Sequence, residues 1–175
     1  FTKGWSFKDV ISPHMGKQVY VTVESLLDTS KRFMSGKTIW CGFNIGDPLH
    51  WGYSLALCNP ISSIEELGND GYDNYHAPIL NENGEPFLRR MWISGQFKFS
   101  KENDLKYGEP VGFKEIVTSV KHLQKLDTIV CEYKRSFSNS NGLAVVETRK
   151  FGYISGKYNN KPSANFNTGP IDKFT

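Results

Sequence analysis

The sequence predicts an α+β fold in which a curved antiparallel sheet wraps around one central helix. Two observations predict it: a segment with helical spacing of apolar residues lies in the first half, and four strand-like segments follow in the second. At 175 residues, the chain fits one domain with a sizeable core. One helix packed on a run of antiparallel strands is a common α+β arrangement.

The helix is expected at 21–33, within an otherwise irregular first half that five prolines and the turn-rich stretch LGNDGYDN interrupt. Its apolar residues fall near one face: Val23, Leu26, Leu27 and Phe33. Either Thr22 or Ser25 is available to cap its N-terminus, because a side-chain hydroxyl can accept a hydrogen bond from the first free backbone N–H groups.

The four strands are expected at 90–100, 112–123, 127–138 and 142–155. Each is rich in β-branched and aromatic residues, and each is bounded by Gly, Asn, Asp or Ser. Between the last two, Asn141 and Gly142 can supply the positive φ angles of a tight hairpin turn, although the SNSNGL loop allows several turn types.

This order of elements is typical of the hot-dog fold, and also of lipocalin-like or cystatin-like domains. We expect the domain to cover residues 1–155. Residues 156–175 are rich in Asn, Gly and Pro, and we expect them to form a linker or tail that leads toward a second domain.

Composition limits the possible functions. With 38% hydrophobic and 22% charged residues, the sequence is typical of a soluble globular protein, and no apolar run approaches the roughly 20 residues of a membrane helix. The net charge is only +3 and the basic residues are scattered along the strands, which disfavours a nucleic-acid partner.

Cysteine and histidine spacing suggests neither a disulfide framework nor a metal or other cofactor. The three cysteines lie far apart without CxxC spacing, and we expect each to be a small buried apolar residue in a reducing compartment: Cys41, Cys58 and Cys131. The histidines outside the DPLH segment are not grouped with other ligands at metal-binding spacing, so we interpret them as solvated or turn residues: His14, His76 and His122.

Several motifs in a fixed order resemble the N-terminal half of the mitochondrial type 2 hydroxyacyl-thioester dehydratases and related mesaconyl-CoA hydratases, a MaoC-like hot-dog family. The motifs are LHW at 49–51, ELGNDG at 66–71, RRMWISG at 89–95, GEPV at 108–111 and the glycine-led last strand from Gly142. One departure is Ser94, where relatives usually have a second glycine. The resemblance spans roughly residues 5–155.

The resemblance implies a mitochondrial hydro-lyase that reversibly removes water from a 3-hydroxyacyl thioester, the dehydration step of fatty-acid synthesis. Such chemistry needs an acid, a base and donors to the thioester oxygen. The family's acid/base motif has the form D-x-N-P-x-H and belongs to the second, C-terminal domain. Asp47 and His50 in DPLH are spaced too closely to match it. We therefore predict a structural role for both and no catalytic residue in this chain.

Five residues are candidates for substrate binding: Arg89, Arg90, Trp92, Trp51 and Tyr53. The two arginines either bind a phosphate of coenzyme A or of a phosphopantetheine arm, or lie solvated at the start of a strand. The three aromatic residues either line an acyl tunnel or belong to the core.

Two hypotheses remain for the chain. In the first, it shapes the acyl-thioester channel of a dehydratase, and its partner half, a second hot-dog domain, supplies the acid and base. The expected protein partner is this second domain of the same protein, or other copies in a homo-oligomer. The substrate is then an acyl thioester of coenzyme A or of acyl carrier protein. In the second, it is a non-catalytic acyl-binding or structural module of hot-dog or lipocalin-like type.

Overall fold

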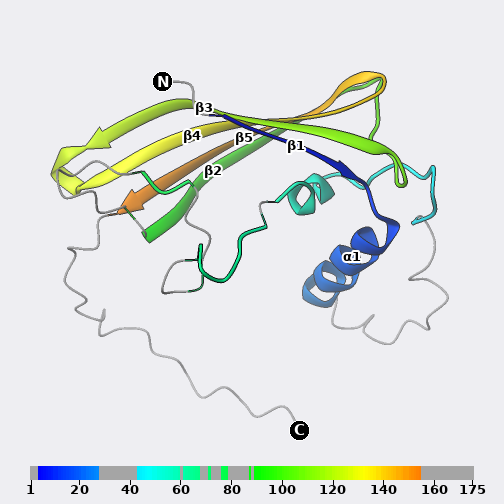
Figure 1. The fold of residues 1–175 in the computed structure, drawn as a ribbon, viewed down its shortest axis with the longest axis horizontal. Coiled ribbons are helices and arrows are strands. Elements are labelled where there is room, and N and C mark those ends of the chain that lie inside the picture. Colours follow the sequence, from blue (N-terminus) through cyan, green and yellow to red (C-terminus); the bar gives the residue numbers. More distant parts are fainter. Residues whose placement is uncertain are drawn as a thin grey trace, which may run out of the picture.

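The computed structural model describes residues 4–27, 43–59, 61–67, 71, 76–78, 87 and 89–154. Their elements, in chain order, are β1 (Gly4–Val10), α1 (Pro13–Leu27), the short 3-10 helix η2 (Tyr53–Ala56), β2 (Arg89–Phe99), β3 (Pro110–Leu123), the 3-10 turn η3 (Gln124–Leu126), β4 (Thr128–Asn139) and β5 (Gly142–Ile154). Figure 1 shows their arrangement.

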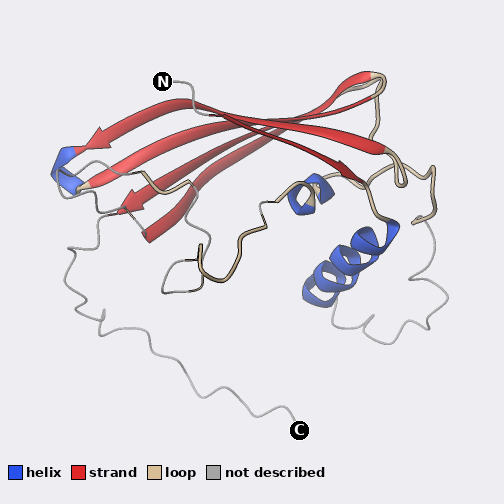
Figure 2. Cartoon of the chain, in the orientation of Figure 1, coloured by secondary structure: helices blue, strands red, loops and turns tan. Residues whose placement is uncertain are grey.

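The strands form one antiparallel sheet in the order β1-β3-β4-β5-β2, with β1 and β2 at its edges. The sheet is curved, and α1 and η2 lie on one side of it (Figure 2). We call this covered side the inner face. The α+β class and the four predicted strands are confirmed.

The sequence reading missed β1, which pairs with β3 along seven residues. Within it, the large inward side chains of Trp5 and Phe7 alternate with the outward Ser6 and Lys8. That alternation is a strand signal, but the segment is short and lies in the half of the chain that appeared irregular.

Helix α1 begins at Pro13 rather than at Val21, because its capping residue is Ser12. The Ser12 hydroxyl accepts a hydrogen bond from the His14 N–H at 3.2 Å, and proline is favoured at the first helical position. The predicted cap Thr22 instead lies within the helix, where its hydroxyl donates to the Gln18 carbonyl at 2.9 Å. The predicted helical residues after Leu27 lie outside the described part of the chain.

The helix joins the core near the end of the sheet where β1 ends (Figure 1). Met15 and Tyr20 pack against the main buried cluster, and the helix approaches Tyr107 so closely that a Cβ at Gly16 would overlap its ring. Val21 and Val23 are exposed. Met15, Gly16 and Tyr20 thus connect α1 to the core.

The β4–β5 hairpin turns through Ser140 and Asn141, between the paired residues Asn139 and Gly142. Gly142 has a φ of 108°, as expected, whereas Asn141 is not among the positive-φ residues of the described chain. The pairing of β4 with β5 shifts register between Phe137 and Ser138, just before the turn. The turn therefore needs one left-handed residue rather than two, and glycine meets that need without steric cost.

The core divides into two clusters on the inner face. One contains Ile11, Phe43, Tyr107, Phe113 and Phe137 among others, and the other contains Phe87, Ile129, Cys131, Tyr133, Phe151 and Tyr153. Cys58 and Cys131 are buried and unpaired, as predicted, while Cys41 lies outside the described residues. None of the described helices is long and apolar enough to cross a membrane.

Candidate functional site

A row of charged side chains crosses the middle of the inner face. Register pairs Glu115 on β3 with Arg135 on β4, and Arg135 with Glu147 on β5. All three side chains are at most 2% exposed. Arg135 donates from Nη1 to Glu147 Oε2 at 2.9 Å, and its Nε lies 3.3 Å from Glu115 Oε2. The buried positive charge is thus held between two negative ones.

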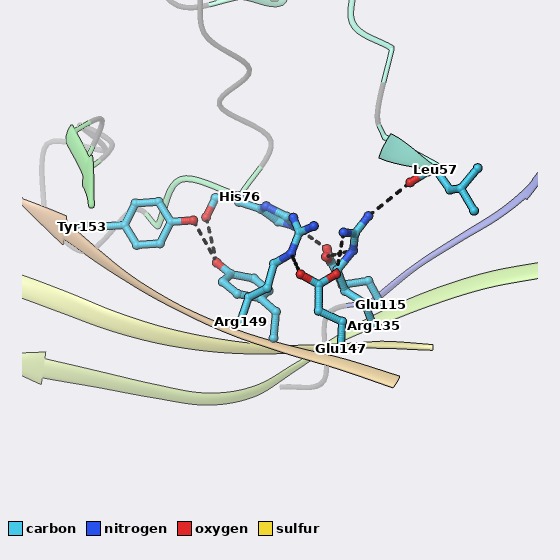
Figure 3. Close-up of polar contacts among 8 residues, drawn as sticks. Leu57, His76, Glu115, Arg135, Glu147, Arg149 and Tyr153 are labelled. Carbon is cyan, nitrogen blue, oxygen red and sulfur yellow. Dashed lines mark hydrogen bonds and ion pairs between the residues drawn. The ribbon is translucent and has the colours of Figure 1, made fainter. Parts of the chain in front are cut away.

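Two further residues complete this ionic row (Figure 3). Arg149 donates from Nε to the second carboxylate oxygen of Glu147, and Nε2 of His76 contacts Glu115 Oε1. Arg135 also reaches the Leu57 carbonyl through Nη2 at 3.4 Å, and its guanidinium lies over the Phe113 ring at 4.7 Å. The network therefore ties the sheet to two segments that cover it.

Electrostatics favours a structural role for this row. Burial, followed by the charge of Arg149, lowers the pKa of Arg135, while Glu147 and Glu115 raise it. Each carboxylate contacts two cationic or hydrogen-bonding partners. Oxygens engaged in this way stabilise the buried guanidinium.

His76 lies at a turn, one of the two predicted alternatives, but sequence reasoning missed its burial. Its side chain is only 6% exposed and packs edge-on against Trp5, with ring centroids 4.8 Å apart. The sequence did contain a signal for the buried ionic row that His76 joins. Glu115 and Arg135 each occupy an inward position between apolar residues on consecutive strands, and Glu147 follows the inward Val145 on the next strand, which predicts that they pair with one another.

Asp47 and His50 have separate partners in the structure. Asp47 Oδ2 accepts hydrogen bonds from the Asn44 N–H at 2.8 Å and from Asn44 Nδ2 at 3.1 Å, so this carboxylate closes a turn. Nδ1 of His50 lies 3.2 Å from the Tyr107 hydroxyl. Neither a hydrogen bond nor an ion pair joins Asp47 to His50, both of which lie in the described part of the chain.

The aromatic candidates Trp51 and Tyr53 lie near the end of β2. Trp51 is 79% exposed and stacks on Phe99 at 5.4 Å, while Tyr53 stacks on the ring of His50 at 5.0 Å. Trp51 also lines a small pocket with Ser54 and Asn103. Because Ser54 Oγ and Asn103 Oδ1 are buried and have no hydrogen-bond partner among the described residues, this pocket can stabilise a small polar group.

The other candidates lie at the start of β2. Arg90 lies over the Phe151 ring at 5.5 Å, Arg149 lies over the Trp92 ring at 5.8 Å, and Trp92 meets Phe151 edge-on at 5.1 Å. Two guanidinium groups and two aromatic rings thus form one partly exposed layer. Arg89 precedes Arg90 in a strand, so the two side chains point to opposite faces of the sheet.

The five predicted binding residues therefore do not form one site. Arg90 lies about 30 Å and Trp92 about 23 Å from Phe99, on which Trp51 stacks, because a strand rises about 3.3 Å per residue. Between them the inner face carries the buried ionic row. A channel that used both groups of residues would have to run along the outside of β2.

The sheet and single helix form a hot-dog fold, and comparison with solved structures supports this class. A C-terminally truncated HadBC (3R-hydroxyacyl-ACP dehydratase) complex from Mycobacterium tuberculosis has a TM-score of 0.51 at 9% identity, over 86% of this chain and 95% of that one. A monoamine oxidase regulatory protein from Archaeoglobus fulgidus has the same TM-score at 10% identity, over 87% and 89%. The lipocalin-like and cystatin-like alternatives are thereby set aside.

The sequence itself identifies the family. Residues 52–174 match the family model described as hydroxyacyl-thioester dehydratase type 2, and the chain belongs to that family. No curated protein matches the chain significantly in sequence. The family assignment therefore depends on this match, and the solved structures independently support the fold.

Proposed function

We propose that this chain is the N-terminal, non-catalytic hot-dog half of a 3-hydroxyacyl-thioester dehydratase that acts in mitochondrial fatty-acid synthesis. It shapes the channel for an acyl thioester of coenzyme A or of acyl carrier protein. The reaction removes the α proton and the 3-hydroxyl group as water to give the 2-enoyl thioester. The family match supports the reaction class, and the ordered sequence motifs support the assignment to the N-terminal half.

The observation that carries the proposal is the apolar edge strand β2. Met91, Trp92 and Ile93 are each about half exposed, at 54%, 49% and 45%. An 11-residue edge strand with unpaired backbone groups and apolar side chains is an aggregation hazard unless something covers it. A second hot-dog domain, or a second copy of the chain, would cover it and place the layer of Arg90 and Trp92 at the junction.

The partners of Asp47 and His50 support a non-catalytic role for this half. A general acid and base for dehydration need to reach the same substrate, whereas here one side chain closes a turn and the other stacks among aromatic rings. The acid and base then come from the second domain. Burial of acyl methylenes along the junction would contribute about 0.8 kcal/mol each.

Hydration of crotonyl-CoA and of a longer enoyl-CoA tests the proposal, with residues 1–175 alone compared against a longer protein that contains them. We expect turnover by the longer protein and none by residues 1–175. Comparable turnover by both would place the acid and base within this chain, with Asp47 and His50 as the first candidates. No turnover by either, together with binding of a fatty acyl ligand, would favour the acyl-binding module.

A further inference from the structure

The outer face of the sheet, the side turned away from α1 and η2, is a separate surface. Strand alternation puts onto it the residues between the buried ones: Lys114 lies between Phe113 and Glu115, and Lys134 between Tyr133 and Arg135. No described segment packs over this face (Figure 2). As far as the described residues go, nothing covers the side chains of this face, and they are available to a partner.

Four lysines form a diagonal stripe across this face. Lys8 on β1 pairs with Gly112, two residues before Lys114, and Lys134 on β4 pairs with Ile116, two residues after Lys114. Lys134 in turn pairs with Thr148, two residues before Lys150 on β5. Each step moves one strand across and two residues along, about 7–8 Å. We call these four residues the lysine stripe.

The stripe has little compensating negative charge. Lys8, Lys114 and Lys134 are exposed and form no ion pair with a described residue. Lys98 and Lys121 add two more exposed lysines to the same face. Glu132 is the one acidic side chain on the outer face of the described strands, and it pairs with Lys150 at 3.2 Å. The fold thus concentrates positive charge that is scattered along the sequence.

The chemistry of the face distinguishes between classes of polyanion. The stripe contains lysine and no arginine. Polar residues separate most of its members (Ser6, Ser136, Thr148 and Gln96), and the apolar Ile116 and Val146 stand singly among them. Nucleic-acid surfaces favour arginine for phosphate and aromatic rings for bases. Stable attachment to a membrane needs an apolar anchor beside the charge. On the described strands the outer face has no aromatic ring and, around the stripe, only isolated apolar side chains, so its separated exposed lysines fit carboxylates spread over a protein surface.

We propose that the outer face is a docking surface for an acidic protein, with Lys8, Lys114 and Lys134 as its main contacts. Because these charges are exposed and the apolar side chains beside them stand singly, the contact is steered by charge and weakened by salt. It lies on the side of the sheet opposite the layer of Arg90 and Trp92, so a partner bound there leaves that layer free. This inference does not depend on the proposed dehydratase activity.

The test uses residues 1–175 and fluorescein-labelled poly-L-glutamate as the acidic probe, with binding followed by fluorescence anisotropy. One variant changes the unpaired stripe lysines to glutamine: Lys8→Gln, Lys114→Gln and Lys134→Gln. The matched control removes the same charge from exposed lysines outside the strands: Lys101→Gln, Lys106→Gln and Lys125→Gln. Circular dichroism and thermal unfolding confirm that both variants are folded. A variant with arginine at the three stripe positions keeps the charge.

We expect the glutamine stripe variant to bind about tenfold more weakly, since three exposed charge pairs are lost, and the control to stay within about twofold. The arginine variant keeps the affinity, and raising NaCl from about 50 to about 300 mM weakens wild-type binding. Equal loss in the stripe and control variants would overturn the proposal, because net charge alone would then explain binding. Tighter, stripe-dependent binding to a single-stranded RNA or to phosphatidylserine vesicles would overturn it in favour of those partners.

Discussion

Arg135 and Glu147 form an ion pair at the centre of the inner face, where the Nη1–Oε2 distance is 2.9 Å and the side chains are 2% and 0% exposed. Glu115 contacts the other side of the same guanidinium, and Arg149 the other oxygen of Glu147. A charge buried in this way depends on all its partners, since none can be replaced by water.

Replacing Arg135 with methionine is therefore expected to destabilise the fold by about 3–5 kcal/mol, because it leaves two buried carboxylates without their shared partner. Urea unfolding followed by circular dichroism measures the change. Lys134→Met on the outer face is the matched control, and we expect it to stay within about 0.5 kcal/mol. A loss below about 1 kcal/mol for Arg135→Met would show that the carboxylates are already neutral or solvated.

Stability is expected to fall at alkaline pH. Burial raises the pKa of Cys58 to about 11 and that of Tyr107 to about 12. Below about pH 8 both groups are largely protonated in both states, and their contribution to stability is essentially complete. As pH rises further, the unfolded chain loses these protons first, so the free energy of unfolding decreases until the folded-state pKa values are passed.

Urea titrations at several pH values between 8 and about 11 measure this slope. Cys58→Ala removes one of the two groups and is expected to flatten the slope relative to wild type, although its stability at pH 7 is lower. An unchanged slope in Cys58→Ala would mean that the thiol ionises equally in both states.

Substituting His50 with alanine is expected to affect folding more than chemistry. The imidazole stacks between Phe43 and Tyr53, with centroid distances of 4.9 and 5.0 Å. Losing two ring contacts at about 0.5–1.5 kcal/mol each lowers the free energy of unfolding by about 1–3 kcal/mol. His50→Phe keeps the stack and is expected to recover most of that stability.

Turnover by the catalytically active protein that contains this chain should then stay within about threefold for both His50 variants. A stable His50→Phe protein that had lost activity by about 100-fold, the usual scale for a missing general acid or base, would restore His50 as a catalytic candidate.

Arg90 and Arg89 offer a matched pair for the substrate-binding hypothesis, since adjacent strand residues face opposite sides of the sheet. Arg90→Ala in the active enzyme is expected to raise KM for the acyl thioester about tenfold or more and leave kcat nearly unchanged. The reason is that a phosphate held far from the reacting atoms contributes equally to ground state and transition state.

Arg89→Ala is expected to leave both kinetic constants within about twofold. Steady-state kinetics with substrates of several chain lengths separates the effects on phosphate binding and on acyl length. Equal increases in KM for the two variants would mean that the arginines act through overall charge and not through a site on the inner face.

The strands and the last hairpin could be predicted because their signals are local. Alternation in each segment of the second half and a single glycine at position 142 sufficed for β2 to β5. The predicted start of α1 was wrong. Ser12 and Pro13 begin the helix before the apolar spacing on which the prediction was based. The predicted roles of Asp47 and His50 and of the five binding residues stay predictions, now with defined contacts.

By itself, the sequence determined the fold class, four of the five strands and the family. All of these depend on which residues are neighbours in the chain. The tertiary structure alone decided which charges meet. His76 contacts Glu115 across 39 residues, and lysines from four strands align in one stripe, because strand register brings distant residues within side-chain reach. Burial strengthens the contact between His76 and Glu115, whereas exposure leaves the lysine stripe available to a partner.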